Sequence, residues 1–321
     1  EVIYGGTNNG VYRSSDRGET WTFVGIAQPE QKKPAPRRRR GAHAASHRTA
    51  NHHAAHPELS GKYATVPTAQ KRYSAKGRSS RAAQKVEEKP KPPEPTGPPM
   101  LELTKEVDDV TGYADKDGHF VLYAAAIDGL YKTQDETKGW ERINITGYPP
   151  DGRVLAVSTS KDAPDKVFAG TQNGLYISLD GGASWDHVDR GPSDMSVKSI
   201  AQDPDDPNLV IVGTNHFIYR STNGGRSWVM RGGGLTVGDY NSVVFNPGNT
   251  KEVMVGDYLR GGVYRSTDKG YNWDRIDSGL PSSRVWILTF DPFEKDKLFA
   301  GSFSSGVYVL TIQHPVRAGQ N

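Results

Sequence analysis

Eight side chains whose types could bind a ligand lie in segments that break an otherwise regular repeat. Asp239 and Asp257 are the one pair that we nominate for the two carboxylates of an ordinary glycosidase, which face each other about 5–9 Å apart. Aromatic faces stack on sugar rings, and a guanidinium donates two hydrogen bonds to a carboxylate. The candidate ligand-binding residues are His216, Asp239, Tyr240, Asp257, Tyr258, Arg260, Arg284 and Trp286.

Two alternatives to a glycosidase site stay open: solvated loops, or a ligand site without catalysis. The segments could be solvated loops with incidental aromatic side chains, because most loop aspartates form turns. A sialidase would need three converging arginines and a Phe/Tyr-Arg-Ile-Pro stretch, and the sequence has no such stretch. We therefore assign no residue a catalytic role, and the eight side chains are candidates for binding a sugar or a peptide terminus.

A repeated motif must position these loops. The segment GLYISLDGGASW ends at Trp185, and four similar segments end at Trp21, Trp140, Trp228 and Trp273. Its alternating residues predict a half-buried strand, and its Asp and Gly predict a tight turn. The turn residues, which we expect to be structural, are Ser14, Asp16, Gly18, Trp21, Asp135, Trp140, Ser178, Asp180, Gly182, Trp185, Ser221, Asn223, Gly225, Trp228, Ser266, Asp268, Gly270 and Trp273.

The pattern S-x-D-x-G-x-[TS]-W resembles the Asp-box, or BNR, repeat. Similar repeats occur in sialidases, sortilin-type receptors, xyloglucan-active glycoside hydrolases and photosystem II assembly factors. The resemblance implies that the box is a structural turn at the edge of a blade, away from any active site. Asn223 agrees with this role, because an amide oxygen can replace a carboxylate in a turn but rarely in acid–base chemistry.

The spacing of the repeats predicts an all-β fold, a β-propeller of four-stranded antiparallel blades. The repeat tyrosines Tyr12, Tyr131, Tyr176, Tyr219, Tyr264 and Tyr308 are about 45 residues apart once a 73-residue segment after Tyr12 is removed. Four strands fit into each such unit. We expect about six blades in this chain, as the C-terminal part of a seven-bladed ring.

Comparison of the repeats predicts which positions face a ligand. Positions that recur serve the scaffold, whereas those that vary between blades are free to bind. One position of the first strand reads Leu155, Lys198, Asn241 and Trp286 in successive blades. We expect it near one mouth of the central channel.

Residues 28–100 differ from the rest in composition. They contain 16 of the 40 Lys and Arg, 11 of the 21 prolines, and neither Trp nor Phe. Such a segment cannot bury enough apolar surface to fold, so we predict a disordered insertion. We assign residues 1–27 to a partial first blade and 101–321 to the other blades of the same domain.

Partners and location follow from the remaining features. The basic insertion, which includes Arg37–Arg40, could contact anionic surfaces, but no aromatic platform for specific nucleic-acid binding accompanies it. The irregular spacing of His43, His47, His52, His53 and His56 predicts no metal site, and no cofactor is expected. Cysteine is absent, and no apolar run is long enough for a transmembrane segment. The resemblance implies a secreted or periplasmic binding scaffold with a protein or glycan ligand, or alternatively a carbohydrate-active hydrolase.

Overall fold

The computed structural model describes residues 2–24, 100–114, 118–277, 280, 284–291 and 293–312, which belong to one compact unit. The predicted insertion, with its histidines and Arg37–Arg40, lies outside the described residues except for Met100. Among the described residues every regular element is a β-strand, and no helix is long and apolar enough to cross a membrane.

The strands form six antiparallel sheets, in each of which neighbours in sequence are neighbours in space. Blade 1 contains β1 (Ile3–Thr7), β2 (Gly10–Ser14) and β3 (Thr22–Phe23); blade 2 contains β4 (Val107–Ala114), β5 (Phe120–Ala126), β6 (Gly129–Thr133) and β7 (Glu141–Ile143); blade 3 contains β8 (Val154–Ser160), β9 (Ala163–Thr171), β10 (Gly174–Ser178) and β11 (Asp186–His187). Blade 4 contains β12 (Val197–Asp203), β13 (Asp206–Thr214), β14 (Ile218–Ser221) and β15 (Val229–Arg231); blade 5 contains β16 (Tyr240–Phe245), β17 (Val253–Asp257), β18 (Val263–Ser266) and β19 (Asp274–Arg275); blade 6 contains β20 (Val285–Phe290), β21 (Lys297–Ser302) and β22 (Gly306–Thr311).

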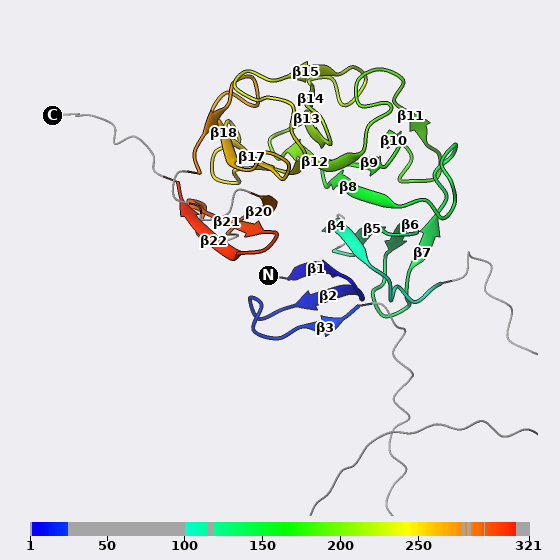
Figure 1. The fold of residues 1–321 in the computed structure, drawn as a ribbon. Helices are drawn as coiled ribbons and strands as arrows, with labels where there is room; N and C mark the ends of the chain where they lie inside the picture. Colours follow the sequence, from blue (N-terminus) through cyan, green and yellow to red (C-terminus); the bar gives the residue numbers. More distant parts are fainter. Residues whose placement is uncertain are drawn as a thin grey trace, which may run out of the picture. The chain divides into compact units, whose positions relative to one another are not determined.

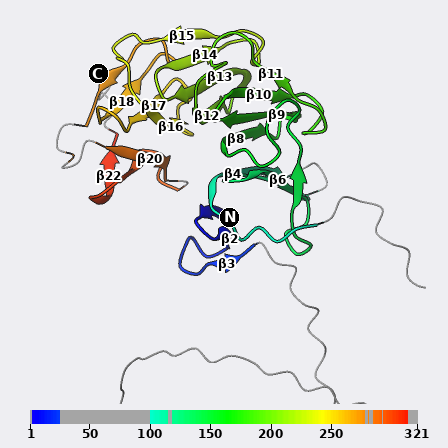
Figure 2. The same ribbon diagram turned by 45° about the vertical axis from the view of Figure 1, so that its right-hand side comes forward.

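The blades follow one another around a common centre, with β8 and β12 towards it and β11 and β15 at the periphery (Figures 1 and 2). This arrangement is a β-propeller, and it confirms the predicted fold class. Among the described residues blades 1 and 6 each have three strands, since blade 1 shows no inner strand and blade 6 no outer strand. The described strands make six blades, so the seven-bladed ring stays a prediction.

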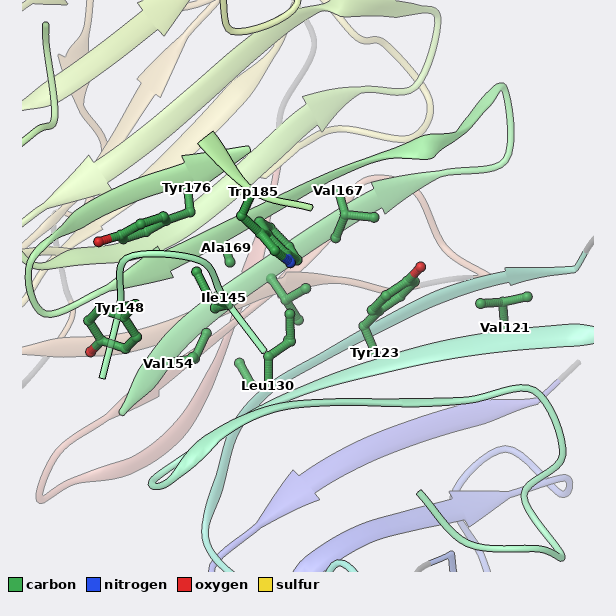
Figure 3. Close-up of a cluster of buried hydrophobic side chains, with 12 residues drawn as sticks. Val121, Tyr123, Leu130, Ile145, Tyr148, Val154, Val167, Ala169, Tyr176 and Trp185 are labelled. Atoms are coloured by element: carbon green, nitrogen blue, oxygen red, sulfur yellow. The ribbon is translucent and has the colours of Figure 1, made fainter. Parts of the chain in front are cut away.

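The core lies between neighbouring blades. Figure 3 shows one such layer, in which Tyr123 and Leu130 of blade 2 meet Val154, Tyr176 and Trp185 of blade 3. A glycine in the second strand lets the next inner strand approach closely. A Cβ on Gly170 would lie only 2.7 Å from the carbonyl oxygen of Val197, so the recurrence of glycine here follows from packing.

One face of blade 6 is more exposed than the same face of blades 3–5. Val307 occupies the position of Leu175, Ile218 and Val263, which the next blade buries almost completely. Val307 itself is 70% exposed. The contact of blade 6 with blade 1 includes Arg17, whose guanidinium carbon lies 4.4 Å from the centre of the Phe293 ring.

The repeated turns share one set of hydrogen bonds. In blade 3 the Ser178 hydroxyl donates to Asp180 Oδ1 (2.7 Å) and accepts the backbone N–H of Gly182 (2.8 Å). Asp180 Oδ1 also accepts the N–H of Ser184 (2.8 Å), and the Trp185 indole donates to the Gly182 carbonyl (3.0 Å). The serine and aspartate bonds recur in the turns of blades 1 and 5.

Two copies vary this pattern. In blade 4 the Asn223 amide oxygen takes the place of the carboxylate and accepts from Ser221 (2.9 Å) and from the N–H of Ser227 (2.9 Å). In blade 2 the indole of Trp140 donates instead to the carbonyl of Val24 in blade 1 (2.9 Å). In these turns the aspartate oxygen, or in blade 4 the Asn223 amide oxygen, accepts hydrogen bonds that hold the backbone of the turn.

We expect Asp180→Asn to remove a part of the loss of fold stability that occurs as the pH falls. The hydroxyl of Ser184 and neighbouring N–H groups hold the pKa of Asp180 at about 2, below its ordinary value of 3.8. A carboxyl with a depressed pKa stabilises the fold above its unfolded pKa and loses this effect as the pH falls through its folded pKa. The melting temperatures of wild type and variant should therefore converge between about pH 4 and pH 2.

Asn223→Asp is the matched reverse change for this measurement. It should introduce at blade 4 the acid sensitivity that Asp180→Asn removes at blade 3, because Asn223 Oδ1 accepts the same serine hydroxyl and backbone N–H bonds as Asp180 Oδ1. The bond with the following serine runs the other way, since Asn223 Nδ2 donates to the Ser227 hydroxyl whereas the Ser184 hydroxyl donates to Asp180 Oδ2, and an aspartate at 223 can accept it. Melting curves recorded from pH 2 to pH 7 that run parallel for all three proteins would show that these turn carboxyl groups make no ionised contacts that matter.

Candidate functional site

A cavity of about 580 Å³ opens between the inner strands of blades 2–6. Its wall includes the position that the repeat comparison predicted to face the channel, with Leu155, Lys198, Asn241 and Trp286. Asp108 of β4 occupies the same register in blade 2 and also lines the cavity. The varying side chains of five blades thus surround one space.

Ion pairs fix the charged side chains of the wall. Arg153 donates from Nε to Asp108 Oδ2 (2.8 Å) and from Nη2 to Asp108 Oδ1 and Glu106 Oε1 (2.5 Å each). Lys198 Nζ lies 2.7 Å from Asp239 Oδ2. Both cations of the cavity are therefore already bound to carboxylates.

Asp109 is the most perturbed acid of the cavity. Its Oδ2 accepts the backbone N–H of Val157 in the next blade (3.0 Å). Burial raises the pKa of Asp109 to about 6, against the lowering effect of the N–H bonds of Val157 and Val110. Its charge therefore changes close to neutral pH.

Three aromatic rings gather beside the cavity. The centroid of Tyr258 lies 5.4 Å from that of Trp286 and 5.6 Å from that of Phe303, both in edge-on contacts. The guanidinium of Arg284 lies 5.5 Å from the Tyr258 centroid. Trp286 is 51% exposed and Phe303 60%, so the rings offer apolar surface to solvent. We call Tyr258, Trp286 and Phe303 the aromatic cluster.

The predicted site residues divide into four groups. Tyr258, Arg284 and Trp286 come together at the aromatic cluster, and Asp239 pairs with Lys198 on the cavity wall. His216 and Arg260 are exposed, in the β13–β14 turn and the β17–β18 loop. The backbone carbonyl of His216 accepts the N–H of Gly238, next to Asp239 (3.1 Å).

Asp257 and Tyr240 lie in the interior. Asp257 has no exposed surface, and its Oδ1 accepts the N–H groups of Asp239 (3.0 Å), Leu259 (2.9 Å) and Arg260 (3.2 Å). The Tyr240 hydroxyl donates to the carbonyl of Thr236. Both side chains therefore hold the loops beside the cavity, and their predicted contact with a ligand stays a prediction.

Four residues of the site escaped sequence reasoning. Asp108 and Asp109 were hidden because blade 2 has alanine in place of the marker glycine and a longer β4–β5 hairpin, so counting back fails there. Arg153 precedes β8 and belongs to no repeated position. Phe303 did carry a signal, since it interrupts a turn that reads Asn-Gly in other blades. Within the described residues no group of three side chains is arranged to hold a metal ion.

Comparisons with known proteins reach the fold. No protein-family model and no curated protein sequence matches the chain. Among solved structures it is similar to the extracellular domain of a one-component system from B. thetaiotaomicron (17% identity, TM-score 0.51, covering 66% of this chain and 28% of that one). A chain of the mitotic checkpoint complex is also similar (15% identity, TM-score 0.51, 67% and 64%), as is an ancestral GH74 enzyme (22% identity, TM-score 0.49, 63% and 36%).

These identities extend the likeness to the propeller fold and no further. The chain spans about a third of the length of the first two kinds of structure, the GH74 enzyme and the extracellular domain. A likeness at this level of identity shows the fold alone and leaves the function open.

Proposed function

We propose that this propeller is a non-enzymatic binding or assembly scaffold whose ligand face is the mouth of the central cavity. The observation that carries the proposal is the juxtaposition of the cavity with the exposed aromatic cluster. Exposed aromatic rings that hold one another in place lose little side-chain entropy on binding, so they are suited to ligand contact. The ligand is a protein or a glycan.

The carboxylates that a glycosidase would need are engaged elsewhere. Asp257 is fully buried and holds three backbone N–H groups, and Asp239 is paired with Lys198. A general acid and its partner must both reach the substrate. This favours binding over hydrolysis for the pair nominated from the sequence.

A carbohydrate-active hydrolase is the second candidate, and Asp109 favours it. This acid lines the cavity with a pKa of about 6, a value suited to a general acid near neutral pH. The partner carboxylate would have to be Asp108 or Asp239, both of which are in ion pairs.

The remaining proposals concern the chain as a whole. Residues 1–27 and 101–321 form a single domain, and residues 28–100 are an insertion that contacts anionic surfaces through its positive charge. The protein acts outside the cytoplasm, as the resemblance of its repeats implies.

The two candidates are separated by incubating the full chain with cellohexaose and xyloglucan oligosaccharides and following new reducing ends by chromatography. We expect no products. Product formation that disappears in Asp109→Asn would replace the scaffold by the hydrolase. Asp186→Asn, a change on the exposed outer strand β11, is the matched control and should behave as wild type.

A further inference from the structure

The charge balance of the cavity favours a positively charged ligand. Its wall and ion pairs contain four carboxylates, from Glu106, Asp108, Asp109 and Asp239, against two cations, Arg153 and Lys198. Arg284 stacks on Tyr258, and neither Arg284 nor Arg260 lines the cavity. The space therefore has an excess of negative charge.

Two buried acceptor atoms lie at the cavity without a hydrogen-bond donor in the described part of the chain. Asn241 Oδ1 on the wall and Asp239 Oδ1 beside it are buried and have no hydrogen-bond partner among the described residues. Buried acceptors without a partner destabilise a site until a donor reaches them. A ligand that donates hydrogen bonds would satisfy both atoms.

Trp286 adds a third feature. Its half-exposed ring forms part of the wall, makes an edge-on contact with Tyr258 (5.4 Å between centroids) and lies tilted against Phe303 (6.0 Å). An ammonium or guanidinium group is attracted to an indole face, with tryptophan the strongest of the aromatic partners. Negative charge, free acceptors and an aromatic face together match a cationic donor.

Resting on the proposed scaffold function, we infer that the cavity binds a lysine or arginine side chain presented by a partner polypeptide. A carboxylate ligand would have to displace Asp108 from Arg153 or Asp239 from Lys198, because those carboxylates already occupy the cations. A neutral sugar could satisfy the acceptors but would leave the excess charge unbalanced.

The test is calorimetric titration of the full chain at pH 7.5 with an end-blocked hexapeptide of alternating glycine and lysine. The same peptide with glutamate in place of lysine and cellohexaose are the comparison probes. The lysine peptide should bind at least about tenfold more tightly than either. Trp286→Ala should weaken its binding by roughly 2- to 30-fold, the range of a cation–π contact.

Two carboxylate variants separate a specific site from general attraction to an acidic surface. Asp108→Asn keeps the shape of the wall, leaves Glu106 to hold Arg153, and should weaken binding several-fold. Asp186→Asn removes the same charge from the exposed strand β11 and should leave the affinity unchanged within about twofold. Circular dichroism checks that each variant is folded.

The pH dependence gives an independent reading. Asp109 shares the cavity with Asp108 on its own strand, with Arg153 before β8 and with Lys198 on β12. Because burial raises the pKa of Asp109 to about 6, its negative charge is lost on going from pH 7.5 to pH 5. The affinity for the lysine peptide should fall over this range, and the fall should be smaller in Asp109→Asn.

The outcomes distinguish the inference from the function on which it rests. Equal binding of the lysine and glutamate peptides, or equal effects of Asp108→Asn and Asp186→Asn, overturns the cationic ligand. If the glutamate peptide or cellohexaose binds instead and Trp286→Ala weakens it, the ligand face survives and only the ligand class is wrong. If Trp286→Ala affects none of the three probes, the ligand face fails as well.

Discussion

Trp140→Ala should lower the free energy of unfolding by roughly 3–5 kcal/mol, the cost of truncating a large buried aromatic side chain. Trp140 is completely buried in the layer between blades 1 and 2. Its indole also donates to the carbonyl of Val24, so the truncation leaves that carbonyl without its donor. Urea denaturation followed by circular dichroism measures the change.

Trp21→Ala is the matched control, since it removes the same side chain from an equivalent turn. Trp21 is 46% exposed, whereas Trp140 is fully buried against blade 1. We expect a loss below about 2 kcal/mol, in proportion to the smaller buried area. Equal losses in the two variants would mean that the layers between blades are not the source of stability.

Asp257→Ala should lower the free energy of unfolding by roughly 2–4 kcal/mol. Asp257 is buried, and one of its oxygens holds three backbone N–H groups of the two loops that carry Asp239 and Tyr258. Without the carboxylate these donors lose their acceptor in a region that excludes water. Chemical denaturation of the variant tests this role.

Asp257→Asn and Tyr258→Ala define what the result means. The asparagine keeps an acceptor oxygen, so its cost should be no more than about half that of alanine. Tyr258→Ala should weaken ligand binding with little change in stability, because Tyr258 belongs to the exposed aromatic cluster. If Asp257→Ala keeps its stability but loses its affinity for the ligand, Asp257 contacts the ligand directly and the structural role is wrong.

The scaffold could be predicted because each blade packs against its neighbour through the same residue types at the same spacing. Trp185 and Trp273 occupy equivalent places against the preceding blade, and Asn223 accepts the bonds that Asp180 accepts. The spacing of about 45 residues therefore predicted one sheet for each repeat. The variation of one position of the inner strand between blades likewise predicted that Lys198 and Asn241 face the channel, and both line the cavity.

The site could be predicted only where it keeps the register of the repeat. Asp257 looks like a free loop carboxylate in the sequence, but its direction is set by three N–H groups from two loops. Arg153 donates to Asp108 of the neighbouring blade, which lies 45 residues earlier in the sequence. Contacts of this kind depend on the arrangement of non-repeated loops, about which the repeat pattern carries no information.

Hydrogen–deuterium exchange with and without the lysine peptide tests most directly that ligands bind at the cavity mouth. Binding there should slow exchange in residues 106–111, 236–242, 257–262 and 284–289, which surround the cavity and the aromatic cluster. The turns 178–185 and 266–273 should exchange at unchanged rates, since their polar groups bind one another. Protection confined to those turns would contradict the account, because it would put the ligand at the edge of the blades.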